Sequence, residues 1–111
     1  MTPEELIQKQ LDAYNTCDID GFCATCAKDI LVRDGDGKVI CKGVKEVRER
    51  YGPLFKDNPH QMAIIEQRLS GGIYVVDEEV VTGRADGVQR RALILYKVVN
   101  DLCTEMTIVK K

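Results

Sequence analysis

Apolar and polar residues alternate along most of the second half of the chain, and this period of two predicts β-strands. Segments rich in glycine, asparagine and aspartate separate the alternating runs and favour tight turns. The predicted strands cover residues 61–69, 73–83, 88–99 and 102–109. Strands joined by tight turns pair antiparallel, so this half of the chain predicts a curled antiparallel sheet.

Near the start of the chain the apolar residues change to helical spacing. Ile7, Leu11 and Tyr14 lie at intervals of four and three residues, which places them on one face of a helix. A threonine and a proline at positions 2 and 3 favour a helix start, so a helix is predicted over residues 3–16. Gln10 borders the same face, and we therefore expect Gln10 and Tyr14 to point into the interior.

A short second helix and a hairpin are predicted next. Asp18 is placed to cap this helix, which is expected to close at residues 27–29. Residues 30–34 and 38–42 are rich in β-forming residues and flank a Gly-Asp-Gly segment. Glycines permit a tight reversal there, so the two runs predict a small hairpin.

A third helical pattern covers residues 44–55, and Pro53 within it is expected to kink or end the helix. The predicted order is thus two helices, two strands, one helix and four strands. Helices gathered on one face of a curved sheet define an α+β fold, and a concave sheet leaves a pocket beside them. Because the chain has no repeat or flexible linker, residues 1–111 are predicted to form a single domain.

A two-residue turn after Ala85 would fix the pairing of the two longest strands. This register places Glu79 opposite Ile94 and Asp77 opposite Tyr96, all on one face. The other face of the same strands also carries apolar residues. Since the helices can cover only one face, we expect a second copy of the chain to cover the other, as in a homodimer.

Composition and charge exclude some partners. The chain has 111 residues, of which 44% are hydrophobic and 31% charged, as in an ordinary globular domain. A formal net charge of −2 gives no electrostatic reason to bind nucleic acid or an anionic membrane. Neither a signal peptide nor an apolar run long enough to span a bilayer occurs in the sequence, so a cytoplasmic protein is expected.

The five cysteines do not follow a disulfide or metal pattern. They are Cys17, Cys23, Cys26, Cys41 and Cys103. An odd number without an export signal favours free thiols. Cys23 and Cys26 form a C-x-x-C, but it lies in the predicted second helix, and no second pair or nearby histidine completes a tetrahedral site. We therefore expect no metal and no cofactor, and buried thiols that pack as small apolar residues.

Four segments together resemble a known superfamily. They are residues 14–22 (YNTCDIDGF), residues 27–29 (AKD) followed by Arg33-Asp34, residues 43–48 (GVKEVR) and residues 96–101 (YKVVND). In this order they resemble the nuclear-transport-factor-2-like superfamily, and within it the SnoaL-like branch that includes ketosteroid isomerases and polyketide cyclases. The resemblance implies a cone: a curved antiparallel sheet around three helices, an apolar pocket at the open end, and dimers formed through the outer sheet face.

The resemblance to the ketosteroid isomerases implies three catalytic positions in this chain. Their general base, an aspartate at the end of the first strand, falls on Asp34. Their helix-one tyrosine falls on Gln10, one turn before Tyr14, and their oxyanion aspartate falls on Ile94 or Leu95. Two of the three positions thus differ, and each lost oxyanion donor costs roughly 3 to 4 kcal/mol. A standard isomerase is therefore not predicted.

The candidate catalytic residues are Asp34, Tyr14 and Gln10, and Asp77 or Glu79 could supply a second carboxylate. The candidate pocket residues are Phe22, Tyr51, Phe55, Glu79, Ile94, Tyr96 and Met106. Asp34 can equally be a solvated turn residue beside its glycine neighbours, and Tyr14 can be a core aromatic with a satisfied hydroxyl. The only histidine, His60, has no partner for a metal site or a catalytic triad.

Three functions remain open from the sequence. The first is an enzyme similar to a steroid delta-isomerase, which would transfer a proton on a small apolar carbonyl substrate. The second is a binding module that holds a small apolar molecule without catalysis. The third is a dimeric accessory protein whose pocket is filled by its own side chains.

Overall fold

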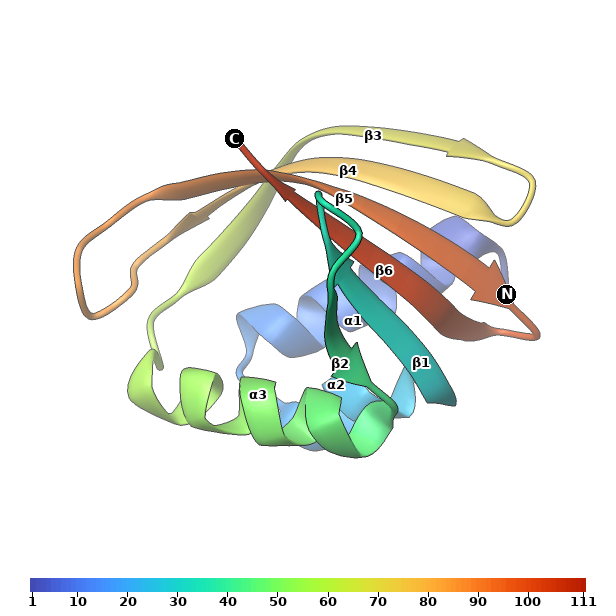
Figure 1. Ribbon diagram of the computed structural model, residues 1–111. Coiled ribbons are helices and arrows are strands. Elements are labelled where there is room, and N and C mark those ends of the chain that lie inside the picture. The colour runs from blue at the N-terminus through green and yellow to red at the C-terminus, as the bar shows by residue number, and fades with distance from the viewer.

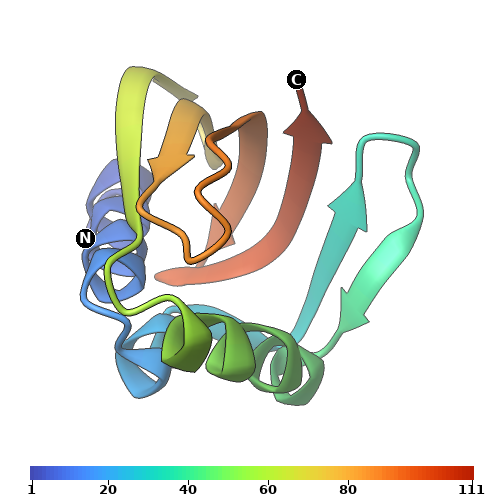
Figure 2. The same ribbon diagram turned by 90° about the vertical axis from the view of Figure 1, so that its left-hand side faces the viewer.

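The computed structural model describes all 111 residues as three helices and one open six-stranded sheet (Figure 1). The elements are α1 (Pro3–Asn15), α2 (Ile19–Ala24), β1 (Cys26–Asp34), β2 (Val39–Lys42), α3 (Val44–Asp57), β3 (Met62–Gly71), β4 (Tyr74–Thr82), β5 (Arg90–Val99) and β6 (Leu102–Lys110). Figure 2 shows the strands curving from β3 round to the β1–β2 hairpin, with α2 and α3 below them. The predicted α+β cone is confirmed. None of the helices is both long and apolar enough to cross a membrane.

The sheet is mixed, which differs from the predicted antiparallel sheet. Its strand order is β2-β1-β6-β5-β4-β3, and β1 runs parallel to β6, with Val32 paired to Met106. All other neighbouring strands are antiparallel. The prediction missed this pair because β1 and β6 lie far apart in the chain, where no turn signal reports on their pairing.

The first helix forms as predicted. Thr2 Oγ1 accepts a hydrogen bond from the Glu5 amide at 3.1 Å, and Glu5 Oε1 accepts one from the Thr2 amide at 2.8 Å. This reciprocal capping satisfies two backbone donors at the helix start. Ile7 is buried, whereas Leu11 and Tyr14 are only half-buried. The helix therefore presents Tyr14 at the edge of the core, where its hydroxyl can reach polar groups.

The second helix is shorter than predicted. It ends at Ala24, and Cys26 already belongs to β1, so the C-x-x-C spans a helix end and a strand start. The reason is tertiary pairing: the Cys103 amide donates to the Thr25 carbonyl at 2.8 Å, and Cys26 pairs with Cys103 across β1 and β6. Both thiols are buried, and burial raises the pKa of each to about 12. They pack as apolar core residues.

Pro53 lies inside the third helix and does not end it, which was one of the two outcomes predicted for this residue. α3 continues through it to Asp57. Pro53 is exposed, so water can bind the Glu49 carbonyl that loses its helical partner. Two residues later Phe55 is buried against Phe22 with ring centroids 5.5 Å apart, and this packing favours continuation of the helix.

The register between β4 and β5 is shifted by two residues from the prediction. Glu79 pairs with Ala92, and Asp77 pairs with Ile94. A turn does close at the predicted place, because the Gly87 amide donates to the Arg84 carbonyl at 2.9 Å. The flanking residues do not continue the ladder, however. An even shift keeps each side chain on its predicted face, so Asp77 and Glu79 still point inward.

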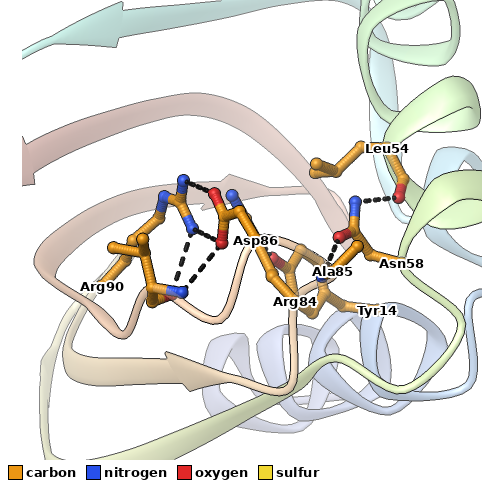
Figure 3. Close-up of polar contacts among 8 residues, drawn as sticks. Tyr14, Leu54, Asn58, Arg84, Ala85, Asp86 and Arg90 are labelled. Atoms are coloured by element: carbon orange, nitrogen blue, oxygen red, sulfur yellow. Dashed lines mark hydrogen bonds and ion pairs between the residues drawn. The ribbon is translucent and has the colours of Figure 1, made fainter.

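Residues 83–89 form a loop that other contacts hold in place (Figure 3). The Asn58 side chain donates to the Leu54 carbonyl at 2.8 Å and accepts from the Ala85 amide at 2.9 Å, which ties the loop to the end of α3. Asp86 Oδ2 binds Arg90 Nη2 at 2.6 Å. The Ala85 amide, which a two-residue hairpin would pair with Val88, binds Asn58 instead, and this contact favours the shifted register.

Candidate functional site

A cavity of about 490 Å³ lies among α3, β4, the β4–β5 loop and the ends of β5 and β6. A smaller cavity of about 40 Å³ lies against α1 and the inner sheet face. Tyr14, Tyr51 and Glu79 line both, so the two cavities adjoin at these side chains. We call the large cavity, which many basic residues line, the mouth of the site. The small cavity, which several aromatic residues line, is called the inner cavity.

Glu79 is the carboxylate at this junction. It points inward from β4 opposite Ala92, whose small side chain leaves space in front of it. No hydrogen bond or ion pair within the chain holds its carboxylate. Burial raises the pKa of the Glu79 carboxyl from its ordinary 4.5 to about 7; the negative charge of Asp77 adds to this rise, and Arg84 opposes it. A carboxyl that is half ionised near neutral pH can both accept and release a proton.

Asp77, two residues earlier on the same face, is held in a different way. Its side chain is 1% exposed, and Arg68 binds it with two bonds, Nε to Oδ1 at 2.6 Å and Nη2 to Oδ2 at 2.9 Å. Arg68 also donates to Gln8 Oε1 at 2.8 Å. The bidentate pair fixes Asp77 as a structural group, which leaves Glu79 as the unpaired carboxylate of the inner face.

Two tyrosines beside Glu79 can donate hydrogen bonds to a ligand. Tyr51 and Tyr96 are buried and line the inner cavity, and neither hydroxyl has a partner within the chain. Burial raises the pKa of both hydroxyls, and the nearby Glu79 charge raises them further. Both hydroxyls therefore keep their protons at neutral pH and remain donors.

The hydroxyl of Tyr14 is already engaged. It accepts a hydrogen bond from Arg84 Nη2 at 3.0 Å and lies 3.4 Å from Gln61 Oε1, to which it can donate. Gln10 is buried, and its Nε2 donates to Thr25 Oγ1 at 3.0 Å at the edge of the inner cavity. Both side chains reach the cavity, as expected, but their polar groups bind other parts of the chain. Their catalytic role stays a prediction.

Asp34 lies in the turn between β1 and β2. Its Oδ1 accepts from the Asp36 amide at 2.9 Å and from the Lys38 amide at 3.0 Å. Asp34 lines neither of the two cavities. The Asp34 carboxylate thus organises the turn, which is the alternative role that its glycine neighbours predicted. The catalytic role of Asp34 stays a prediction.

The predicted pocket residues separate into two groups. The inner cavity is lined by Phe22, Tyr51, Glu79, Tyr96 and Met106. Phe55 and Ile94 line neither cavity. Phe55 instead packs on Phe22 and Tyr51, and Ile94 is buried in the sheet opposite Asp77. The sequence reasoning missed the basic residues of the mouth, which come from four separate parts of the chain and share no motif.

The comparisons with known proteins fit this architecture. The model of the SnoaL-like domain matches residues 7–106. An uncharacterised cystatin-fold protein from Novosphingobium aromaticivorans is 24% identical, with 97% of each chain covered and a TM-score of 0.88. A candidate ketosteroid isomerase from Kribbella flavida is 17% identical, with 98% of this chain and 77% of that one covered and a TM-score of 0.82.

A candidate SnoaL-like polyketide cyclase from Jannaschia is 15% identical, with 98% of this chain and 85% of that one covered and a TM-score of 0.81. None of the curated proteins matches the chain in sequence. At these identities the similarity to solved structures shows the fold alone.

Proposed function

This chain belongs to the SnoaL-like domain family, and from that premise we propose that it binds a small carbonyl compound and transfers a proton with the Glu79 carboxylate. The observation that carries the proposal is the position of Glu79. It is the one inward carboxylate without a partner, and it stands where the mouth meets the inner cavity, among the hydroxyls of Tyr51 and Tyr96.

The proposed step is enolisation. The ionised Glu79 takes a proton from the carbon next to the carbonyl group, and the C–H electron pair moves to form the enolate. Tyr51 and Tyr96 donate hydrogen bonds to the oxygen on which the negative charge develops. The protonated Glu79 then returns the proton to the same or to a neighbouring carbon. The pKa of Glu79 near 7 suits both halves of this cycle.

Proton exchange with solvent tests the step without knowledge of the natural substrate. Small ketones, such as 2-tetralone, a carboxylated tetralone and a 3-oxo-Δ5 steroid, are incubated in D2O, and deuterium uptake next to the carbonyl is followed by NMR. We expect the wild-type protein to accelerate uptake for at least one ketone. Glu79→Gln should lower that acceleration by about 100-fold, because it removes the proton acceptor but keeps the shape.

Glu78→Gln is the matched control. Glu78 is the neighbouring residue on β4, but it points to the outer face, where it binds Lys111 Nζ at 2.5 Å. We expect this variant to exchange protons at the wild-type rate. Equal rates for wild type and Glu79→Gln with every ketone would contradict the proposal. The protein would then be better described as a binding module, the alternative function.

We also propose that two copies of the chain associate through the outer sheet face. Leu69, Val76 and Leu95 lie side by side across β3, β4 and β5 on that face, and Leu69 and Leu95 are 61% and 42% exposed. The charges around this apolar band are already paired within the chain, as in Arg91 with Glu66 at 2.6 Å. A neutral apolar band suits contact with an identical copy.

Sedimentation tests the dimer. The wild-type protein should sediment at about twice the chain mass of 12.5 kDa, and Leu95→Glu should sediment as a monomer because it places an unpaired charge in the band. Val39→Glu is the control, since Val39 is 46% exposed on β2, away from the band. A wild-type monomer at micromolar concentration would contradict the proposal. A cytoplasmic location stays a prediction.

A further inference from the structure

The mouth of the large cavity carries a concentration of positive charge that the composition of the chain does not predict. Glu79 is the only acidic residue that lines this cavity. Six lining residues are basic: Arg50, Arg84, Arg90, Arg91, Lys110 and Lys111. The whole chain, in contrast, has a formal net charge of −2. The fold thus gathers cations from α3, the β4–β5 loop and the ends of β5 and β6 around one opening.

Three of these cations are neutralised by carboxylates. The pairs are Arg90 with Asp86 at 2.6 Å, Arg91 with Glu66 at 2.6 Å, and Lys111 with Glu78 at 2.5 Å. None of these carboxylates lines the cavity. These three basic residues are therefore explained by ion pairs at the rim and the outer face, and they need no ligand.

The other three cations, Arg50, Arg84 and Lys110, take part in no ion pair of the chain. Arg84 is the most informative of them. Its Nη2 donates to the Tyr14 hydroxyl at 3.0 Å, as Figure 3 places the two side chains beside each other, but its Nε is buried and has no hydrogen-bond acceptor. Arg84 lines the cavity beside Arg50 and Lys110, so these three side chains bring positive charge to the cavity that forms no ion pair within the chain.

On the basis of the proposed function, we infer that the ligand of this cavity carries an oxoanion, a carboxylate or a phosphate, held by Arg84, Arg50 and Lys110. An oxoanion would neutralise these cations, and the planar guanidinium groups of Arg50 and Arg84 match its geometry. The uncharged part of the ligand then extends past Glu79 toward the aromatic inner cavity. A neutral steroid-like molecule would leave the three cations without a charged partner.

Binding of 2-naphthoate, compared with its neutral methyl ester, tests the inference. The two compounds share the same ring system and differ in charge. Isothermal titration calorimetry at low ionic strength should give a Kd at least tenfold lower for 2-naphthoate, and 2-naphthyl phosphate in a third arm distinguishes a phosphate from a carboxylate site. Raising the salt to 300 mM should weaken binding of the anions and leave the ester unchanged.

Variants assign the site. Arg84→Gln, Arg50→Gln and Lys110→Gln should each weaken 2-naphthoate binding at least threefold. Arg50 and Lys110 lie outside the β4–β5 loop, so they test the site even if Arg84→Gln disturbs that loop. Arg48→Gln is the matched control for Arg50→Gln, because both remove one positive charge from α3. Arg48 does not line the cavity, and it binds the exposed Asp20 at 2.8 Å.

Two results would overturn the inference. One is an ester that binds as tightly as both anions, and the other is equal anion affinity for Arg48→Gln, Arg50→Gln, Arg84→Gln and Lys110→Gln. Neither result bears on proton transfer, which is measured by deuterium uptake. Conversely, Glu79→Gln should still bind 2-naphthoate but no longer accelerate deuterium uptake. The anion site and the proton-transfer function are therefore tested independently of each other.

Discussion

Arg68→Met is expected to lower the free energy of unfolding by about 3 to 5 kcal/mol. Arg68 lies opposite Asp77 on β3 and β4 and holds both of its carboxylate oxygens. Asp77 is 1% exposed, so water cannot replace the lost bonds. The methionine would leave a buried negative charge without a partner, and that desolvated charge accounts for the expected loss.

Arg91→Met is the control for this prediction. Arg91 binds Glu66 at the same distance of 2.6 Å as the Arg68–Asp77 pair, but its pair is exposed on the outer face. Exposed pairs contribute less than about 1 kcal/mol. Urea denaturation should therefore separate the two variants clearly, and the double variant Arg68→Met with Asp77→Leu should recover most of the loss. Similar losses for Arg68→Met and Arg91→Met would contradict the assigned role of the buried pair.

Glu79→Gln is expected to be more stable than the wild type by about 3 kcal/mol above pH 7, and about equally stable below pH 4.5. The folded pKa of Glu79 is about 7, against an ordinary value of 4.5. Below pH 4.5 the residue is protonated in both the folded and the unfolded chain. Between pH 4.5 and 7 the unfolded chain releases the proton and the folded chain keeps it, so the wild type loses stability as the pH rises.

Denaturation at several pH values measures this difference. All other titrating groups are common to both proteins, so the difference between the two stability curves isolates Glu79. It should grow between pH 4.5 and 7 and stay constant above that range. A difference that does not change with pH would mean that the glutamine alters packing, not ionisation.

Local signals in the sequence predicted a substantial part of the fold. The Thr2 and Glu5 pattern predicted the start of α1, and the alternation along β4 predicted that Asp77 and Glu79 share the inner face. The resemblance to the SnoaL-like branch of the nuclear-transport-factor-2-like superfamily is confirmed by the family match and the cone. In each of these cases the information lies within a few neighbouring residues or in the order of whole segments.

Features that depend on distant contacts were not predicted. The parallel pairing of β1 with β6 set the start of β1 at Cys26, and Asn58, just after α3, helped to shift the β4–β5 register by holding the loop. Asp34 illustrates the same limit, because the family position alone could not show that the turn amides bind its carboxylate. The paired state of Asp77 depended on Arg68, which no motif connects to it.

The candidate site also depends on contacts between residues that are far apart in the chain. Glu79 and Asp77 have similar sequence surroundings, and only the structure shows that one is paired and the other is not. Arg50, Arg84 and Lys110 come from α3, a loop and β6, so their convergence on one cavity is a property of the fold. The net charge of the chain gave no reason to expect an anionic partner, because it sums the charges of the whole surface and hides a local cluster of cations.

An NMR titration of the Glu79 side-chain carboxyl carbon tests most directly whether this residue is a partly buried acid–base group. The resonance is assigned by its absence in Glu79→Gln. A midpoint of about pH 7 is expected, because burial of Glu79 and the charge of Asp77 both raise its pKa. A midpoint near 4.5, the ordinary value for glutamate, would contradict both the proposed proton transfer and the pH-dependent stability.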